Sequence, residues 1–221
     1  MQILRELIFH PNSKFTKLNL YKISNDHFSY HINKLLKDNL IQKEGNGYSL
    51  TKHGKIFSAK MDTTNAKDEK QPKVSVMIRA IIKKEKKLYY AIQKRMKEPY
   101  FGFYGFMTGK IKWGEKVSEA VERELMEEMH LSGKIIPAYI LHEMVYDKDG
   151  NMLEDKFFHA VTVVIKKDTL EKNELGCQNQ WMTKEEFLKV EPKYHNEMEI
   201  FNWFENKQKG FVEQTYFIDK F

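Results

Sequence analysis

The sequence contains a single cysteine, Cys177, among 221 residues. One cysteine cannot form an intramolecular disulfide, and a metal site built from several cysteines is excluded for the same reason. A chain without disulfides suits a reducing compartment. We therefore expect a cytoplasmic protein in which Cys177 is chemically inert.

Long apolar runs are also missing. No stretch approaches the roughly 20 consecutive apolar residues that a membrane-spanning helix needs. The first nine residues lack the basic start, the apolar stretch and the small-residue cleavage site of a signal peptide. Hydrophobic residues still make up 41% of the chain and aromatic residues 13%. These values predict a folded core and no membrane partner.

Charge is distributed unevenly along the chain. The net charge is +6 at pH 7. Residues 1–70 carry 12 Lys/Arg and 7 Asp/Glu, a net charge of +5, which leaves +1 for the remainder. A basic segment favours a polyanionic partner, although a solvated Lys-rich surface would produce the same excess.

A polar break lies near residues 62–72, which contain almost no apolar side chains and end in a proline. We interpret residues 63–72 as a linker between two domains, one at residues 1–62 and one at residues 73–221. No internal repeat and no low-complexity tract interrupts either part.

The first part has mostly helical periodicity. Helix-spaced apolar residues at 3–8 are stopped by Pro11, and Ser24 can cap a longer helix with a regular apolar stripe. Gly45-Asn46-Gly47 is a strong hairpin signal. The expected elements are helices at 14–20 and 25–37, strands at 40–43 and 48–50, and a helix capped by Thr51 that runs to Ala59.

Helices followed by a hairpin and a last helix resemble a winged helix-turn-helix, and residues 39–55 resemble the wing and following helix of MarR-, ArsR- and PadR-like regulators. The resemblance implies that the helix at 25–37 enters the DNA major groove. This helix has few cations, and many winged helices instead bind proteins or form homodimers. The candidate DNA contacts are Asn25, His27, Ser29, Tyr30, Asn33, Lys34, Lys43 and Asn46.

The second part alternates strands with helices, which indicates an α+β domain with a mixed sheet flanked by helices. A turn-rich segment at 147–151 separates two of the strands. The expected strands are 73–82, 88–93, 135–145 and 157–165, and the expected helices are 117–129, 184–190 and 195–207.

One segment carries recognisable chemistry. Five residues separate Gly109 from Glu115, and seven more lead to Arg123-Glu124-Leu125-Met126-Glu127-Glu128-Met129-His130-Leu131. This spacing resembles the Nudix box, and every position matches except His130, where the box has glycine. The resemblance extends over about residues 73–205.

The helix that carries these acids has an unusual distribution of charge. At about 100° per residue, Glu124, Glu127 and Glu128 share an arc of about 100° that overlaps the apolar side formed by Val121 and Leu125. A merely solvated acidic face would point away from the apolar side. Clustered carboxylates near a core need a compensating cation, and oxygen-only ligands favour Mg²⁺ or Mn²⁺.

The resemblance implies an α/β/α sandwich and assigns roles within the box. Arg123 would orient a box glutamate through a charge-assisted hydrogen bond. Glu115 would be either structural or a partner that supports the metal ligands without touching the metal, and Gly109 would permit close backbone approach. The metal ligands would be Glu124, Glu127 and Glu128, which with Arg123 form the expected catalytic set.

The implied reaction is the attack of water on the diphosphate of a nucleoside diphosphate derivative. The base would be a box glutamate or a later carboxylate, for which Glu143 and Glu154 are equal candidates. A MutT-like nucleoside triphosphate pyrophosphohydrolase is the default substrate class. Phe103, Tyr104 and Phe106 could stack on a base, although an aromatic strand is more often core.

Two departures from the box affect these expectations. His130 replaces a glycine that commonly ends the helix in a left-handed turn, so we expect a shifted helix end. Met107-Thr108 replaces the usual residues before Gly109 and should alter the loop near the metal.

Two further functions remain open besides an active hydrolase. The chain could be a nucleotide-sensing transcriptional regulator, with the second part as sensor and the first as DNA-binding domain. Alternatively, the winged helix could serve only to form a homodimer or to recruit a partner.

Overall fold

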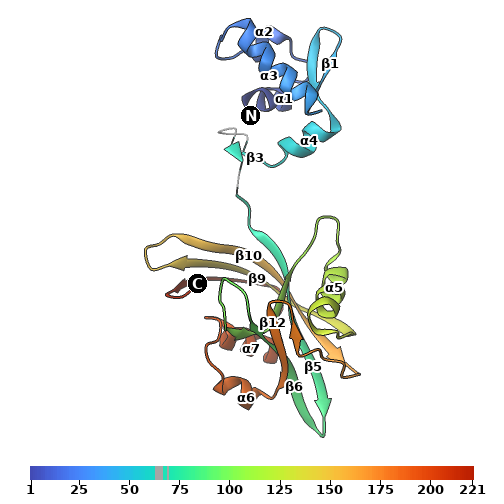
Figure 1. Cartoon of the computed structure of the whole chain (residues 1–221), viewed down its shortest axis with the longest axis vertical. Helices are drawn as coiled ribbons and strands as arrows, with labels where there is room; N and C mark the ends of the chain where they lie inside the picture. The colour runs from blue at the N-terminus through green and yellow to red at the C-terminus, as the bar shows by residue number, and fades with distance from the viewer. Residues whose placement is uncertain (63–66, 69) are drawn as a thin grey trace. The chain divides into compact units, whose positions relative to one another are not determined.

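The structure, a computed structural model, describes residues 1–62, 67–68 and 70–221. It contains two compact units, Met1–Lys70 and Gln71–Phe221 (Figure 1). Residues 63–66 and 69 of the expected linker lie outside the described residues. In the described part of the chain, no helix has the length and apolar character needed to cross a membrane.

The described residues of the N-terminal unit form helices and two pairs of short antiparallel strands. Its hairpin β1–β2 is antiparallel, with Ile41 opposite Leu50. Two side chains cap helices as expected: Ser24 Oγ accepts from His27 N at 3.4 Å and Thr51 Oγ1 accepts from Gly54 N at 2.9 Å. The elements are α1 (Gln2–Phe9), α2 (Phe15–Leu18), α3 (Asn25–Lys37), β1 (Ile41–Glu44), β2 (Gly47–Leu50), α4 (Lys52–Ser58), β3 (Met61–Asp62) and β4 (Lys67–Asp68).

Apolar faces of these helices form one core. Leu4 and Leu7 of α1 pack with Phe28 and Ile32 of α3. Helix α4 approaches the segment before β1 so closely that a Cβ on Gly54 would lie 1.8 Å from the backbone oxygen of Leu40. Only glycine fits at that position.

The C-terminal unit contains one nine-stranded mixed sheet with the order β11-β12-β6-β5-β10-β9-β13. Strands β7 and β8 extend it by pairing with β6 and β5. The pairs β5–β10 and β9–β13 are parallel, and the others are antiparallel. The strands are β5 (Lys73–Lys84), β6 (Lys87–Arg95), β7 (Tyr104–Gly105), β8 (Met107–Lys110), β9 (Gly133–Asp147), β10 (Met152–Ile165), β11 (Asn173–Glu174), β12 (Cys177–Met182) and β13 (Phe211–Ile218).

Helices cover both faces of this sheet. Successive residues of a strand point to opposite sides, so one strand contributes side chains to the cores on both faces. Val76 and Ile78 of β5 pack in a core with α5 (Val117–Met129), whereas Met77 packs in a second core with α6 (Lys184–Lys189) and α7 (Glu197–Glu205). Figure 1 shows α5 separated from α6 and α7 by the sheet. The arrangement confirms the expected α+β class.

Several boundaries differ from expectation. Helix α2 is shorter than the expected 14–20, and α7 is shorter than the expected 195–207. Strands β5, β9 and β10 are longer than predicted because their pairing with neighbours continues past the apolar residues. Strands β7, β8, β11, β12 and β13 were not predicted.

Candidate functional site

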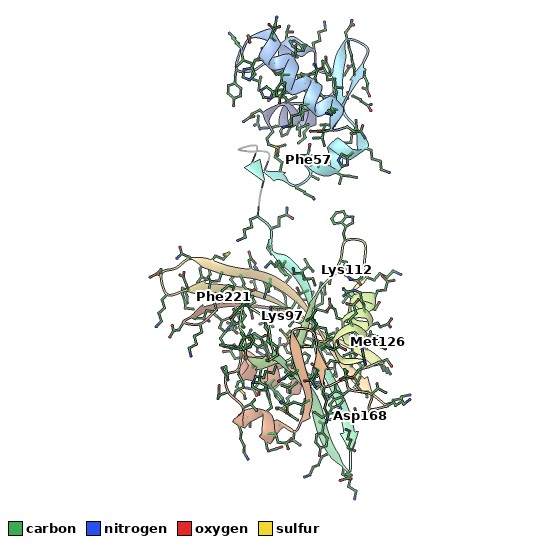
Figure 2. The ribbon with its side chains drawn as sticks, in the orientation of Figure 1. Phe57, Lys97, Lys112, Met126, Asp168 and Phe221 are labelled. Carbon is green, nitrogen blue, oxygen red and sulfur yellow. The ribbon has the colours of Figure 1, made fainter. Side chains whose placement is uncertain are left out.

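A cavity of about 760 Å³ in the C-terminal unit is lined by three acidic residues of the box. Helix α5 contributes Glu124, Glu127 and Glu128, whereas β9 and β10 contribute Glu143 and Glu154. The fold therefore brings two separate acidic groups to one cavity. Figure 2 labels two cationic lining residues, Lys97 from the segment after β6 and Lys112 from the turn before α5.

Arg123 connects four parts of the box. Its Nε and Nη2 donate to the two oxygens of Glu115 at 2.6 and 2.9 Å. Its Nη1 donates to Glu124 Oε1 at 2.7 Å and to Glu127 Oε2 at 3.1 Å, and Nη2 also donates to the Lys110 backbone oxygen at 3.0 Å. These bonds lower the pKa of Glu115 to about 2 and raise that of Arg123. The guanidinium thus fixes the turn before α5 to the helix.

Glu124 is the most enclosed box carboxylate, at 9% exposed. Its carboxyl carbon lies 2.1 Å from the position that a Cβ on Gly109 would occupy. Burial raises the pKa of Glu124, and its neighbours Glu128 and Glu127 raise it further, while Arg123 opposes the shift. A buried carboxyl with two acidic neighbours gains from a nearby cation.

Glu127 and Glu128 differ in environment. The Glu127 side chain is 56% exposed and lies 4.0 Å from Lys112 Nζ. The Glu128 side chain is 23% exposed; its Oε2 accepts from Gln93 Nε2 at 2.9 Å, and its Oε1 lies 3.8 Å from Lys97 Nζ. The expectation of three partly buried carboxylates therefore holds for Glu124 and Glu128 and is wrong for Glu127, which lies at the helix edge.

The donor chemistry at the box fits a hard divalent cation, since every candidate ligand is a carboxylate oxygen. Among the described residues, however, no three acidic, histidine or cysteine side chains are grouped so as to hold a metal ion. The present partners of these carboxylates are Arg123, Gln93, Lys97 and Lys112. A bound cation would replace part of these contacts.

The structure shows the backbone conformation at both departures from the box. His130 caps α5 in the left-handed conformation, with φ 53° and ψ 32°. The helix ends at Met129, so the expected shift of its end is wrong: His130 itself adopts the turn that glycine would adopt. Met107 and Thr108 lie in β8, paired with Ile78 and Met77, rather than in a loop.

The second acidic group lies around Glu143, which is 4% exposed. Asn196 Nδ2 donates to its Oε2, and His195 Nε2 lies 3.8 Å from the same oxygen. Burial raises the pKa of Glu143 to about 7, Lys156 opposes the shift and Glu154 adds to it. Glu154 differs because its Oε2 accepts from Lys156 Nζ at 2.6 Å.

Glu197 is a lining residue that the sequence did not indicate. It is 4% exposed, and its carboxylate accepts from Phe106 N at 3.2 Å. Burial raises the pKa of Glu197 well above its ordinary value. No sequence signal distinguishes it from a surface acid, because it lies in a helix with several acids. The expected aromatic residue Phe106 is 3% exposed and packs on Phe201 while reaching the cavity wall.

The candidate DNA contacts gather on α3 and the β1–β2 hairpin. Two histidines of α3, His27 and His31, have ring centroids 5.0 Å apart. Ser29 is half-buried, whereas the other candidates are exposed: Asn25, His27, Tyr30, Asn33, Lys34, Lys43 and Asn46.

Comparisons with known proteins agree with this fold. The NUDIX domain of Shewanella oneidensis NrtR, solved with ADP ribose, matches with a TM-score of 0.56 at 15% identity, over 71% of this chain and 98% of that chain. The mutator MutT protein from Bacillus halodurans matches with a TM-score of 0.55 at 17% identity, over 67% of this chain and 93% of that chain. At these identities the likeness concerns the fold alone.

No curated protein matches the sequence. A family model described as the NUDIX domain matches residues 71–204, which include strands β5 to β12, helix α5 and every acidic residue of the cavity. Since this match spans more than half of the 221 residues, the chain belongs to the NUDIX family.

Proposed function

We propose that the protein hydrolyses the diphosphate linkage of a nucleoside diphosphate derivative, with nucleoside triphosphates as the first substrate class to test. The observation that carries this proposal is the shared cavity. Its lining includes both the box carboxylates and cationic side chains that can bind phosphate oxygens. The cationic lining residues are Lys73, Arg95, Lys97, Lys110, Lys112, Arg123 and Lys156.

Mg²⁺ or Mn²⁺ is the proposed cofactor, held by Glu124, Glu127 and Glu128. When bound, such an ion neutralises charge on the diphosphate and lowers the pKa of a water molecule. Arg123 orients two of these carboxylates, because one of its nitrogens bonds to both Glu124 and Glu127. Gly109 supports the arrangement by leaving the space that the Glu124 carboxyl occupies.

Glu143 is the proposed general base. The side chain of the rival candidate, Glu154, is already bonded to Lys156, whose Nζ donates to Glu154 Oε2 at 2.6 Å. A base works best when its pKa is close to the operating pH, and the pKa of Glu143 is raised to about 7. Asn196 holds the Glu143 carboxyl in place and so would position it for proton transfer from water.

The test is hydrolysis of a nucleotide panel that includes nucleoside triphosphates, dinucleoside polyphosphates and ADP ribose, with products identified by phosphorus NMR. We expect cleavage of a diphosphate bond in the presence of Mg²⁺ or Mn²⁺, and none with excess chelator. Glu127→Gln should abolish most of the turnover. Tight nucleotide binding without cleavage of any compound would contradict the hydrolase.

That contrary outcome would favour a second function, a nucleotide-sensing transcriptional regulator. Its basis is the N-terminal unit, which we propose to be a winged helix that uses α3 as its recognition helix. The net charge of +5 over residues 1–70 and the exposed polar face of α3 support this proposal. The box retains all its acids, and this favours catalysis as the primary function.

A further inference from the structure

Trp113 lies in the turn between β8 and α5, within the variable residues of the box, and is 97% exposed. Single apolar side chains on a protein surface are common and do not by themselves indicate a binding site. Two features distinguish Trp113 from an isolated apolar side chain on the surface: the constrained backbone that carries it and the charged side chains beside it.

The turn constrains the backbone that carries Trp113. Glu115 N donates to the Lys112 backbone oxygen at 3.0 Å, and Gly114 has φ 82°. These features describe a type II turn with Trp113 at its second position.

Both sides of the turn are tied to α5. Lys112 N donates to Glu115 Oε2 at 2.9 Å, and Arg123 bonds to the Glu115 carboxylate and to the Lys110 backbone oxygen. Arg123 itself belongs to α5. The indole is therefore presented on an ordered backbone, so a ring that stacks on it costs little additional loop entropy.

Cationic side chains flank the indole. Lys110 and Lys112, which precede Trp113, line the cavity, and Lys116, which follows it, has a side chain 80% exposed. Trp113 itself is not among the lining residues. Proteins bind successive nucleotides with two kinds of side chain: cations that contact the phosphates, and aromatic rings that stack on the bases.

We propose that Trp113 is a stacking platform for a second nucleobase, joined through phosphate to the nucleotide whose diphosphate occupies the cavity. This inference rests on the proposed function, because the cavity must hold the first nucleotide. Two kinds of compound share the required chemistry, dinucleoside polyphosphates and 5′-polyphosphorylated oligonucleotides. Both place a base outside the cavity and anionic phosphates along Lys110 and Lys112.

The test compares affinities for ATP, diadenosine tetraphosphate and a 5′-triphosphorylated RNA dinucleotide, measured by calorimetry with Ca²⁺ in place of Mg²⁺. In the wild type, at least one second-base compound should bind more tightly than ATP. Trp113→Ala should reduce that selectivity roughly 5- to 100-fold, the effect of losing one stacked base. Trp113→Tyr should restore part of it.

A control variant and a fluorescence measurement separate stacking from a general effect of losing a surface aromatic residue. Phe217→Ala is the matched control, because Phe217 is another aromatic residue, 68% exposed, on β13; it should leave the selectivity as in the wild type. The second-base compound should also quench wild-type tryptophan fluorescence more strongly than that of Trp113→Phe, which keeps Trp181 and Trp203. The two second-base compounds distinguish the sources, since the better binder identifies the class.

Unchanged selectivity in Trp113→Ala overturns the inference. If Trp113→Ala differs from the wild type in molecular mass by light scattering and keeps the wild-type selectivity, Trp113 contacts another protein chain rather than a base. The two proposals fail differently. If the wild type hydrolyses ATP and Trp113→Ala keeps the wild-type selectivity, only the stacking platform is refuted. If the wild type cleaves no compound and Trp113→Ala loses the selectivity, only the hydrolase is refuted.

Discussion

The charge of each carboxyl in the site is set by its immediate surroundings. Glu115 has a low pKa because Arg123 binds both of its oxygens, whereas burial raises the pKa of Glu124 and Glu143. Carboxyls with such different pKa values can divide the roles of anchor, ligand and base. The motif spacing made Glu115 and Glu124 predictable.

The partners of these acids were less accessible from sequence. Gln93 and Lys97 reach Glu128 from the end of β6, and Asn196 reaches Glu143 from the residue before α7. Each contact joins residues tens of positions apart, so no local spacing predicts it. The choice between Glu143 and Glu154 also required the structure, because it depends on where Lys156 lies.

Replacing the proposed base changes the pH dependence of catalysis. In the wild type, kcat/KM should rise as pH increases through about 7, because burial raises the pKa of Glu143 to that value. Glu143→Gln should lose this rise and about 10²- to 10⁴-fold in rate. The exposed Glu122→Gln serves as control. An unchanged pH profile in Glu143→Gln would assign the base elsewhere.

The same carboxyl also affects stability. The pKa of Glu143 is higher in the folded protein than its ordinary value of 4.5, so its contribution is fully present below about pH 4.5 and is lost as pH rises to about 7. The loss is on the order of 3 kcal/mol, from about 2.5 pKa units at about 1.4 kcal/mol each. Urea unfolding should therefore show a smaller decline in stability across this window for Glu143→Gln than for the wild type. Parallel curves would indicate an ordinary pKa.

At the scale of elements, the site depends on contact between β8 and α5. Elements with strong periodicity were predictable, as α3 and α5 show. Strand β13 was missed because Phe211 and Phe217 are exposed on the same side as Glu213, so the strand lacks the usual alternation of apolar and polar residues. His130 shows that a residue other than glycine can end a helix where glycine was expected.

Gly109→Ala tests the contact between β8 and α5. The added Cβ would lie 2.1 Å from the Glu124 carboxyl carbon, so the flexible acid must move. We expect stability to fall by about 1–3 kcal/mol and activity by on the order of 100-fold. Gly150→Ala is the control: φ 81° strains it, but open space surrounds it. It should lose stability and keep activity. Equal activity in both variants would contradict the role of Gly109.

At the scale of the whole molecule, most of the net positive charge and the proposed catalytic residues belong to different units. If the N-terminal unit binds DNA, the affinity of the full chain for double-stranded DNA should fall steeply with salt. Lys34→Ala and Lys43→Ala should each weaken binding and reduce the slope of log affinity against log salt by about 1. Lys87→Ala in the C-terminal unit is the control. Absence of binding at low salt would leave protein contact as the role of this unit.

The central claim is that the carboxylates of α5 support metal-dependent hydrolysis. Its most direct test is the initial rate of nucleotide hydrolysis against Mg²⁺ concentration for the wild type, Glu128→Gln and Glu122→Gln. The wild type and Glu122→Gln, whose substitution is on the exposed side of α5, should show the same saturable dependence, and Glu128→Gln should lose both rate and Mg²⁺ affinity. Equal curves for all three proteins would contradict the account.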